Sequence, residues 1–231
     1  MAKDTTGRLH VTVKTGGKRK LSSKLWLERQ LNDPYVAQAK RDGFRSRAAF
    51  KLQEIDDKNR FLKQGLVVVD LGAAPGGWSQ IAAKRVGSLE GRGKVVAIDL
   101  LEMPEIPGVD FAQMDFLDEK APDRLRAMIG GGADIVMSDM AANTTGHRKT
   151  DQLRIIGLVE NAAEFAAEVL NPGGTFLAKV FQSGADADLL AQLKRDYTTV
   201  KHVKPAASRQ DSSERYVLAM GFRAARPQIE S

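Results

Sequence analysis

The residues best suited to chemistry in this chain are acids that stand where short apolar segments end. Asp70, Asp99 and Asp139 each follow a run of aliphatic, largely β-branched residues that is typical of a buried strand. Parallel strands of an open α/β sheet end at one edge, and the ligands of such sheets bind there. A single acid at a strand end usually caps a turn or faces water, whereas several at one edge predict a polar cleft.

Two lysines stand in apolar surroundings. Lys179 interrupts the apolar segment 175–181, which is predicted to be a strand. A lysine buried near the carboxyl end of a strand holds its proton less firmly and can act as a base. The alternative is a lysine at the surface whose aliphatic stem is packed. Lys51 lies between two apolar residues of a predicted helix, so its stem is expected to be packed and its ammonium group held near the domain.

A glycine-rich turn, 72–77, follows the first predicted strand and precedes a helix that starts at Trp78. Backbone N–H groups in such a turn can approach a ligand closely. The turn reads G-A-A-P-G-G and not G-x-G-x-x-G. Its spacing therefore favours a ligand with a carboxylate and an amine over a pyrophosphate. A tight turn that binds no ligand remains the alternative.

These residues need a framework that brings the strand ends together, and strands and helices alternate along the chain. The pattern predicts an α/β fold with a mostly parallel sheet. The predicted strands are 67–70, 94–100, 111–116, a strand with its loop at 133–143, 175–181, 198–203 and 216–222. The predicted helices are 25–31, 35–42, 45–55, one from Trp78, 153–170 and 186–195, and a sharp turn is predicted at 171–174.

Composition narrows the function classes. The chain has 231 residues, of which 42% are hydrophobic, enough for one α/β domain with a sizeable core. It has no cysteine and three widely spaced histidines, so we expect no disulfide and no metal site. No apolar run is long enough to span a membrane and no secretory signal is recognisable, so we expect a cytoplasmic protein. The net charge of +6 predicts attraction to polyanions, nucleic acid first.

Three regions are expected. Residues 1–24 form a basic arm with one acid, which we expect to be flexible and to bind phosphates, although a solubilising terminus is the alternative. Residues 25–222 form a single domain, and residues 223–231 form a flexible tail.

Taken together, four motifs resemble the FtsJ/RrmJ family of ribosomal RNA 2′-O-ribose methyltransferases. The likeness extends from about residue 25 to residue 222, and its motifs are together highly specific. They are Arg45-Ser46-Arg47-Ala48-Ala49-Phe50-Lys51-Leu52, the segment Asp70 to Gln80, Met137-Ser138-Asp139-Met140 and Lys179-Val180-Phe181-Gln182. The resemblance implies a Rossmann-like class I methyltransferase fold with a seven-stranded sheet and S-adenosyl-L-methionine as the cofactor.

The resemblance also implies site residues. The family's Lys-Asp-Lys-Glu tetrad falls on Lys51, Asp139, Lys179 and Glu214, with Lys179 as the general base. Glu214 is placed by its position just before the last strand, because the loop that precedes it has weaker landmarks. The implied cofactor contacts are Gly76, Trp78, Asp99, Asp115 and Asp139, and no metal is implied. Ala142 departs from the family pattern, which usually has proline there, and this could loosen the loop at the cleft.

The substrate implied is a uridine 2′-hydroxyl in the A-loop of 23S ribosomal RNA in the large (50S) subunit, acted on by a monomer. The basic arm, Arg45, Arg47 and an exposed loop around Arg148 and Lys149 are expected to hold the phosphates. Alternatives are the same reaction on transfer RNA, a nicotinamide oxidoreductase, and a non-catalytic factor that binds ribosomal RNA during assembly. The absent dinucleotide pattern weighs against the oxidoreductase.

Overall fold

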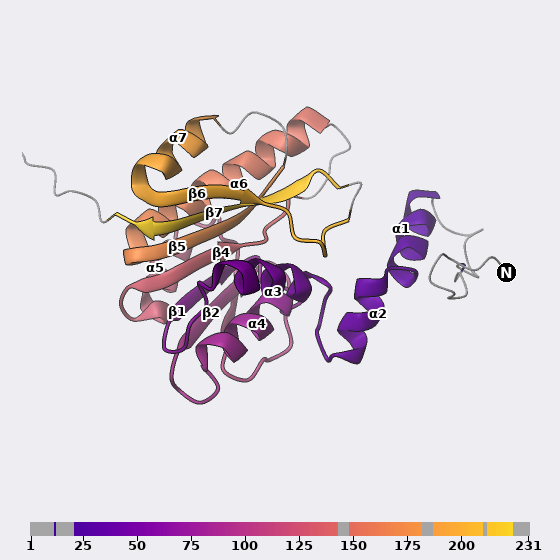
Figure 1. Cartoon of the computed structure of the whole chain (residues 1–231), viewed down its shortest axis with the longest axis horizontal. Coiled ribbons are helices and arrows are strands. Elements are labelled where there is room, and N and C mark those ends of the chain that lie inside the picture. Colours follow the sequence, from indigo (N-terminus) through magenta and orange to yellow (C-terminus); the bar gives the residue numbers. More distant parts are fainter. Residues whose placement is uncertain (1–11, 13–20, 143–147, 182–186, 210–211, 224–231) are drawn as a thin grey trace, which may run out of the picture.

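The computed structural model of the protein describes residues 12, 21–142, 148–181, 187–209 and 212–223 (Figure 1). Seven strands form one sheet in the order β3-β2-β1-β4-β5-β7-β6. β7 runs antiparallel to β5 and β6, and the other pairs are parallel. The predicted fold class, an α/β Rossmann-like sheet of seven mostly parallel strands with helices on both faces, is confirmed.

The elements have the following bounds. The strands are β1 (Val67–Leu71), β2 (Lys94–Asp99), β3 (Asp110–Gln113), β4 (Ala133–Ser138), β5 (Leu170–Phe181), β6 (Tyr197–Val203) and β7 (Glu214–Phe222). The helices are α1 (Leu21–Leu31), α2 (Pro34–Arg41), α3 (Ala48–Asn59), α4 (Gly77–Val86), α5 (Ala121–Ile129), α6 (Arg148–Val169) and α7 (Ala187–Asp196).

The N-terminal boundaries of three helices differ from the sequence-based prediction. Pro34, predicted as a stop, is the first residue of α2, where its missing N–H costs nothing and the Asp33 side chain accepts from the Tyr35 N–H. α3 starts at Ala48, three residues later than predicted, because the Arg45 N–H donates to the Gln80 side chain at 2.9 Å. α1 already begins at Leu21, so its first turn uses residues assigned to the basic arm.

Two further boundaries involve β5 and α6. The predicted turn 171–174 lies inside β5, at a register shift of the β4–β5 ladder where Gly173 has a φ of +85°. α6 begins at Arg148 and not at Leu153, so Arg148 and Lys149 belong to its first turn and not to an exposed loop. The preceding residues 143–147 lie outside the described part, as do most of the basic arm and all but Arg223 of the tail.

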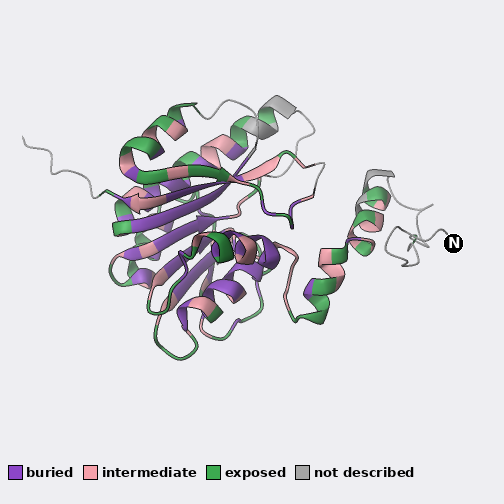
Figure 2. Cartoon of the chain, in the orientation of Figure 1, coloured by how far each residue is buried: buried purple, intermediate pink, exposed green. Residues whose placement is uncertain are grey.

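The sheet has one hydrophobic core on each face. On one face α3 and α4 pack over Val68, Val95 and Ala97, and on the other α5, α6 and α7 pack over Val69 and Val96. Figure 2 shows the central strands as largely buried, whereas β6 at the edge is largely exposed. Because successive strand residues point to opposite faces, the near-continuous apolar strands supply both cores.

α1 and α2 extend from the sheet domain, with α2 next to α3, on the side towards which the parallel strands run (Figure 1). The carboxylate of Asp33, at the start of α2, pairs with Arg47 before α3 and, at 3.2 Å, with Arg209 of the β6–β7 loop. Arg47 also donates to the Ala207 carbonyl. We call Asp33, Arg47 and Arg209 the Asp33 clip, because these three residues fasten the N-terminal helices to the β6–β7 loop.

Within the described residues, no helix is both long and apolar enough to cross a membrane.

Candidate active site

Lys179 and Asp139 meet at the carboxyl edge of the sheet. Asp139 immediately follows β4, and its N–H donates to the Leu71 carbonyl at the end of β1. Lys179 stands near the end of β5, the parallel neighbour of β4. Its side chain is buried, with Nζ 2.5 Å from the Asp139 carbonyl oxygen and 3.2 Å from Asp139 Oδ1. The sequence predicted both residues at this edge, and the structure places them in direct contact.

The antiparallel register of β5 and β7 brings Glu214 to the same place. Lys179 is paired with Tyr216, and Phe181 with Glu214. Directly opposed residues of two strands point to the same face, and so do residues two apart on one strand. Lys179, Tyr216 and Glu214 therefore share one face at one end of the sheet. Glu214 is the first residue of β7 itself and not part of the preceding loop.

Lys51 completes the group from the first turn of α3. Ala49, Leu52 and Ile55 pack α3 onto the sheet, and this packing buries the stem of Lys51. Lys51 Nζ donates to Glu214 Oε1 at 2.5 Å and to the Tyr216 hydroxyl oxygen at 3.1 Å. The four residues Lys51, Asp139, Lys179 and Glu214 thus come from three strand ends and a helix.

Tyr216 links the two lysine–carboxylate pairs. Its hydroxyl oxygen is 2.7 Å from Glu214 Oε1 and 3.1 Å from Asp139 Oδ1, and its ring is completely buried against Trp78. Sequence reasoning missed this residue, because a tyrosine in an apolar strand is typical of the core. The period of two from Glu214 was the signal that could have identified it.

The charges explain the ionisation of this group. Burial raises the pKa of the Glu214 carboxyl, but the charge of Lys51 and hydrogen bonds from Lys51 and Tyr216 outweigh burial, so the pKa lies below its ordinary value. Burial and the nearby carboxylates of Asp139 and Glu214 hold the Tyr216 pKa well above its ordinary value. Glu214 is consequently ionised at neutral pH, and Tyr216 keeps its proton as a hydrogen-bond donor.

The glycine-rich turn lies beside this group, at the end of β1. A Cβ on Gly72 would lie 2.6 Å from Met140 Cγ, next to Asp139, so the turn and the β4 end are in close contact. Gly76 caps α4 with a φ of +107°, and a Cβ there would meet Ile106 and Met103. The positive φ favours glycine at both positions, and at Gly72 the close approach of the Met140 backbone also excludes a side chain.

The predicted cofactor residues differ in their accessibility. Asp99 ends β2, and its carboxylate accepts from the N–H groups of Ala74 and Leu101 at 2.8 Å, which leaves lone pairs for a ligand. Asp115 is exposed after β3 and accepts from the Leu117 N–H at 2.9 Å. Trp78 is buried, and its indole N–H donates to the Ala48 carbonyl at 3.0 Å. Only the backbone of Trp78 is therefore free to serve a ligand.

Asp70, the residue before Leu71, is a completely buried carboxyl at the same edge. Its Oδ2 accepts from Ser79 Oγ at 2.6 Å, and its Oδ1 is buried with no hydrogen-bond partner among the described residues. Burial, with the charges of Asp139 and Asp99, raises the Asp70 pKa to about 7, although the Ser79 hydrogen bond opposes this shift. An unused acceptor of this kind fits a ligand that carries an amine or another cation.

The arginines that were expected to hold phosphates also bind other parts of the protein. The Arg45 guanidinium donates to the carbonyls of Pro104 and Glu105, which lie in the loop after β2. Arg47 belongs to the Asp33 clip. The side chains of Arg148 and Lys149 lie outside what the structure describes. The contacts of Arg47 join residues 14 and 160 positions apart in the sequence, and no local pattern revealed them.

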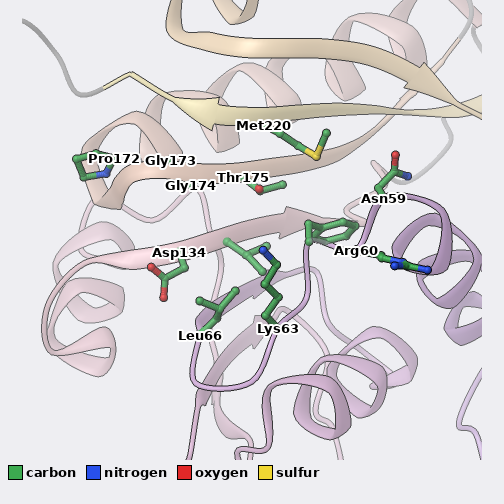
Figure 3. Close-up of a pocket in the computed structure, with 12 residues that line it drawn as sticks. Asn59, Arg60, Lys63, Leu66, Asp134, Pro172, Gly173, Gly174, Thr175 and Met220 are labelled. Atoms are coloured by element: carbon green, nitrogen blue, oxygen red, sulfur yellow. The ribbon is translucent and has the colours of Figure 1, made fainter.

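Two cavities differ in their relation to this group. One of about 360 Å³, lined by Arg60, Lys63, Asp134 and Thr175 among others, opens at the amino-terminal ends of β4 and β5 (Figure 3). None of the predicted site residues lines it, and ligands of parallel sheets bind at the opposite edge. The other, of about 260 Å³, includes Lys51 and Glu214 in its lining. Among the described residues, no group of three or more acidic or histidine side chains could hold a metal ion.

Known proteins resemble this chain over nearly its whole length. A family model described as FtsJ-like methyltransferase matches residues 44–222. A relative named Ribosomal RNA large subunit methyltransferase E, from Afipia carboxidovorans, is 86% identical over 96% of this chain and 99% of its own length. A relative of the same name from Bradyrhizobium diazoefficiens is 83% identical over 96% of this chain and 98% of its own length.

Solved structures show the same fold. A crystal structure from Plasmodium falciparum, whose title assigns it provisionally as a ribosomal RNA methyltransferase, has a TM-score of 0.69 and 28% identity, covering 79% of this chain and 100% of that chain. A methyltransferase of the mycinamycin biosynthetic pathway, solved with Mg and SAH, has a TM-score of 0.50 and 15% identity, covering 98% of this chain and 59% of that chain.

Proposed function

Because the chain belongs to the FtsJ-like methyltransferase family, we propose that it methylates ribosomal RNA of the large subunit, using S-adenosylmethionine. More specifically, we propose the 2′-hydroxyl of a uridine in the A-loop of 23S ribosomal RNA as the acceptor. The observation that carries this proposal is the contact group of Lys51, Asp139, Lys179 and Glu214 beside a glycine-rich turn. The names of the highly identical relatives support the class of substrate.

The residues at the carboxyl edge fit S-adenosylmethionine, which when bound supplies a methyl group activated by a sulfonium centre. Asp99, at the end of the second strand, has lone pairs for the ribose hydroxyls. The unpartnered oxygen of Asp70 suits the amine of the methionine portion. Exposed leucines, Leu100, Leu101 and Leu117, flank Asp99 and Asp115 and offer an apolar surface to a purine ring. Gly76 and the Trp78 backbone border the same turn.

The chemistry requires a base for the ribose hydroxyl. In the proposed step the neutral amine of Lys179 takes the proton of the 2′-hydroxyl, whose oxygen is the methyl acceptor. S-adenosylmethionine, when bound, would supply the methyl group, and its sulfur would keep the electron pair of the broken bond and leave as S-adenosylhomocysteine. The carboxylate of Asp139, 3.2 Å away, then stabilises the ammonium group so formed. Lys51, held by Glu214, provides positive charge while negative charge develops on the oxygen. The rest of the rate enhancement is expected to come from the surrounding strand ends, which align the reacting atoms.

The expected partner is ribosomal RNA within the 50S subunit, approached by a monomer in the cytoplasm, where large subunits are assembled. The positive net charge of +6 favours approach to this polyanion. Methylation of transfer RNA by the same residues is the nearest alternative. A non-catalytic assembly factor is less consistent with the site. Burying four ionisable residues in contact at a strand edge costs desolvation free energy, which a surface that only binds RNA does not need to spend.

The proposal is tested with labelled S-adenosylmethionine and two substrates, large subunits from cells that lack the enzyme and total transfer RNA. We expect label only in 23S ribosomal RNA, and mass spectrometry to place it on one uridine ribose. Lys179→Ala is expected to lower kcat by at least about 100-fold, the contribution of a general base, with cofactor affinity retained in calorimetry. Lys201→Ala, at an exposed position of β6, is the matched control and keeps full activity. Label entering only transfer RNA, or an active Lys179→Ala variant, overturns the proposal.

A further inference from the structure

An arginine-lined cavity of about 260 Å³ opens next to Lys51 and Glu214, on the side of the N-terminal helices. Its lining residues come from three separate parts of the chain: the end of α1, the start of α3, and the β6–β7 loop with the start of β7. They are Arg29, Gln30, Arg47, Lys51, Arg209, Ser212 and Glu214. We call this cavity the arginine cavity.

The charge of the arginine cavity is unbalanced within the described residues. Four cationic side chains, Arg29, Arg47, Lys51 and Arg209, face two carboxylates, Glu214 in the lining and Asp33 in the clip, which leaves two positive charges. Arg29 is exposed, and no carboxylate in the described part of the chain pairs with it. A concave site with excess guanidinium groups attracts an anion, and guanidinium forks match the oxygens of a phosphate.

The Asp33 clip holds two of these arginines in place before any ligand arrives. Arg47 and Arg209 share the Asp33 carboxylate, and the side chains of Arg47 and Asp33 are largely buried. Their orientation therefore costs little entropy on binding, which is the benefit of a preorganised site. A guanidinium group that shares one carboxylate with another arginine still has N–H donors to offer.

We propose that the arginine cavity binds a backbone phosphate of the RNA next to the target ribose. The inference rests on the proposed function and deepens it, since it assigns part of the substrate contact. Lys51 and Glu214 belong both to the cavity and to the catalytic group. A ribose whose 2′-hydroxyl reaches Lys179 is joined to its neighbours by phosphodiesters, so a phosphate necessarily lies close to these residues.

The cavity also gives the N-terminal helices a role. Arg29, Gln30 and Asp33 precede residue 44, where the family match begins, so one wall of the cavity is built outside the matched domain. α1 and α2 thereby become part of the substrate site, fastened to it by the Asp33 clip.

The test compares Arg29→Gln with Arg124→Gln, an exposed arginine on α5, which packs on the opposite face of the sheet. Equilibrium binding to large subunits from cells lacking the enzyme is measured with S-adenosylhomocysteine present, over a range of salt concentrations. Loss of one phosphate contact is expected to weaken binding by about 5- to 10-fold and to reduce the slope of log K against log salt by about 1. Arg124→Gln is expected to have the same binding constant and the same salt slope as the parent protein.

Kinetics supply the second readout. In methyl transfer, Arg29→Gln is expected to raise KM for the subunits by the same factor by which it weakens equilibrium binding. Its kcat and its cofactor affinity are expected to stay within twofold of those of the parent protein. Arg209→Gln is expected to behave alike, and a thermal melt shows whether it also loosens the clip. If Arg29→Gln leaves the binding constant and the salt slope unchanged, the cavity assignment is wrong. Because binding is measured without turnover, that result is separate from a failure of the parent protein to methylate ribosomal RNA.

Discussion

The hydroxyl group of Tyr216 lies 3.1 Å from the carboxylate of Asp139, although Tyr216 belongs to β7 and Asp139 follows β4. β5 separates these two strands in the sheet. The same hydroxyl group accepts from Lys51 and lies 2.7 Å from Glu214. It has one proton, so it donates to one of the two carboxylates at a time, and it couples the Lys51–Glu214 pair to the Lys179–Asp139 pair.

Tyr216→Phe is expected to lower kcat by about 10- to 100-fold, because it removes hydrogen bonds to charged groups worth about 1.5–3 kcal/mol. The ring packing against Trp78 is retained, so KM for the RNA and cofactor affinity are expected to stay within twofold. Steady-state methyl transfer and calorimetry measure these quantities.

Tyr197→Phe is the matched control for this change. Tyr197 is also buried, but its hydroxyl group has no hydrogen-bond partner among the described residues. The phenylalanine variant is expected to keep full activity. Equal activities of the two variants would show that the Tyr216 hydroxyl group does not position the proposed catalytic residues.

Asp70 is expected to make folding stability depend on pH. Burial raises its pKa from 3.8 to about 7, so between about pH 4 and pH 7 the folded state keeps a proton that the unfolded state has released. The free energy of unfolding therefore falls as pH rises through this window, and the effect levels off above pH 7. Asp70→Asn removes this contribution.

Urea unfolding at pH 5, 6, 7 and 8 measures the effect. The parent protein is expected to lose more stability over this range than Asp70→Asn does, while Asp123→Asn, at an exposed position, follows the parent. Parallel pH profiles for the parent and Asp70→Asn would mean that Asp70 is ionised throughout the range.

Gly72→Ala is expected to destabilise the fold more than Gly43→Ala. Both glycines have positive φ, +78° and +75°, so each alanine costs about 1–2 kcal/mol in backbone strain. Only at Gly72 would the new Cβ also approach Met140, with Cγ at 2.6 Å and Cα at 2.9 Å, whereas nothing lies within 4 Å at Gly43.

The additional cost at Gly72 is expected to be about 1–3 kcal/mol, the usual effect of overpacking. Urea unfolding of both variants gives the difference, and cofactor affinity is expected to weaken only for Gly72→Ala. Equal losses of stability would contradict the close contact between this turn and the end of β4.

The sequence alone predicted the strand ends, the glycine-rich turn and, through the family motifs, the four residues Lys51, Asp139, Lys179 and Glu214. These predictions depend on local patterns: a lysine in an apolar strand and acids after apolar runs are visible without coordinates. The same local reasoning did not reveal the protein contacts of Arg45 and Arg47, whose partners lie in the loop after β2, just before α2 and in the β6–β7 loop.

What the sequence by itself determined is the order and type of the elements except α5, which was not predicted, because the periods of apolar residues and the turn-forming residues are properties of short segments. Only the tertiary structure decided which side chains meet. The antiparallel register of β5 and β7 sets Lys179 opposite Tyr216, and the Asp33 clip places α1 beside the proposed catalytic residues. Contacts of this kind depend on strand pairing and packing between distant segments, which no single segment specifies.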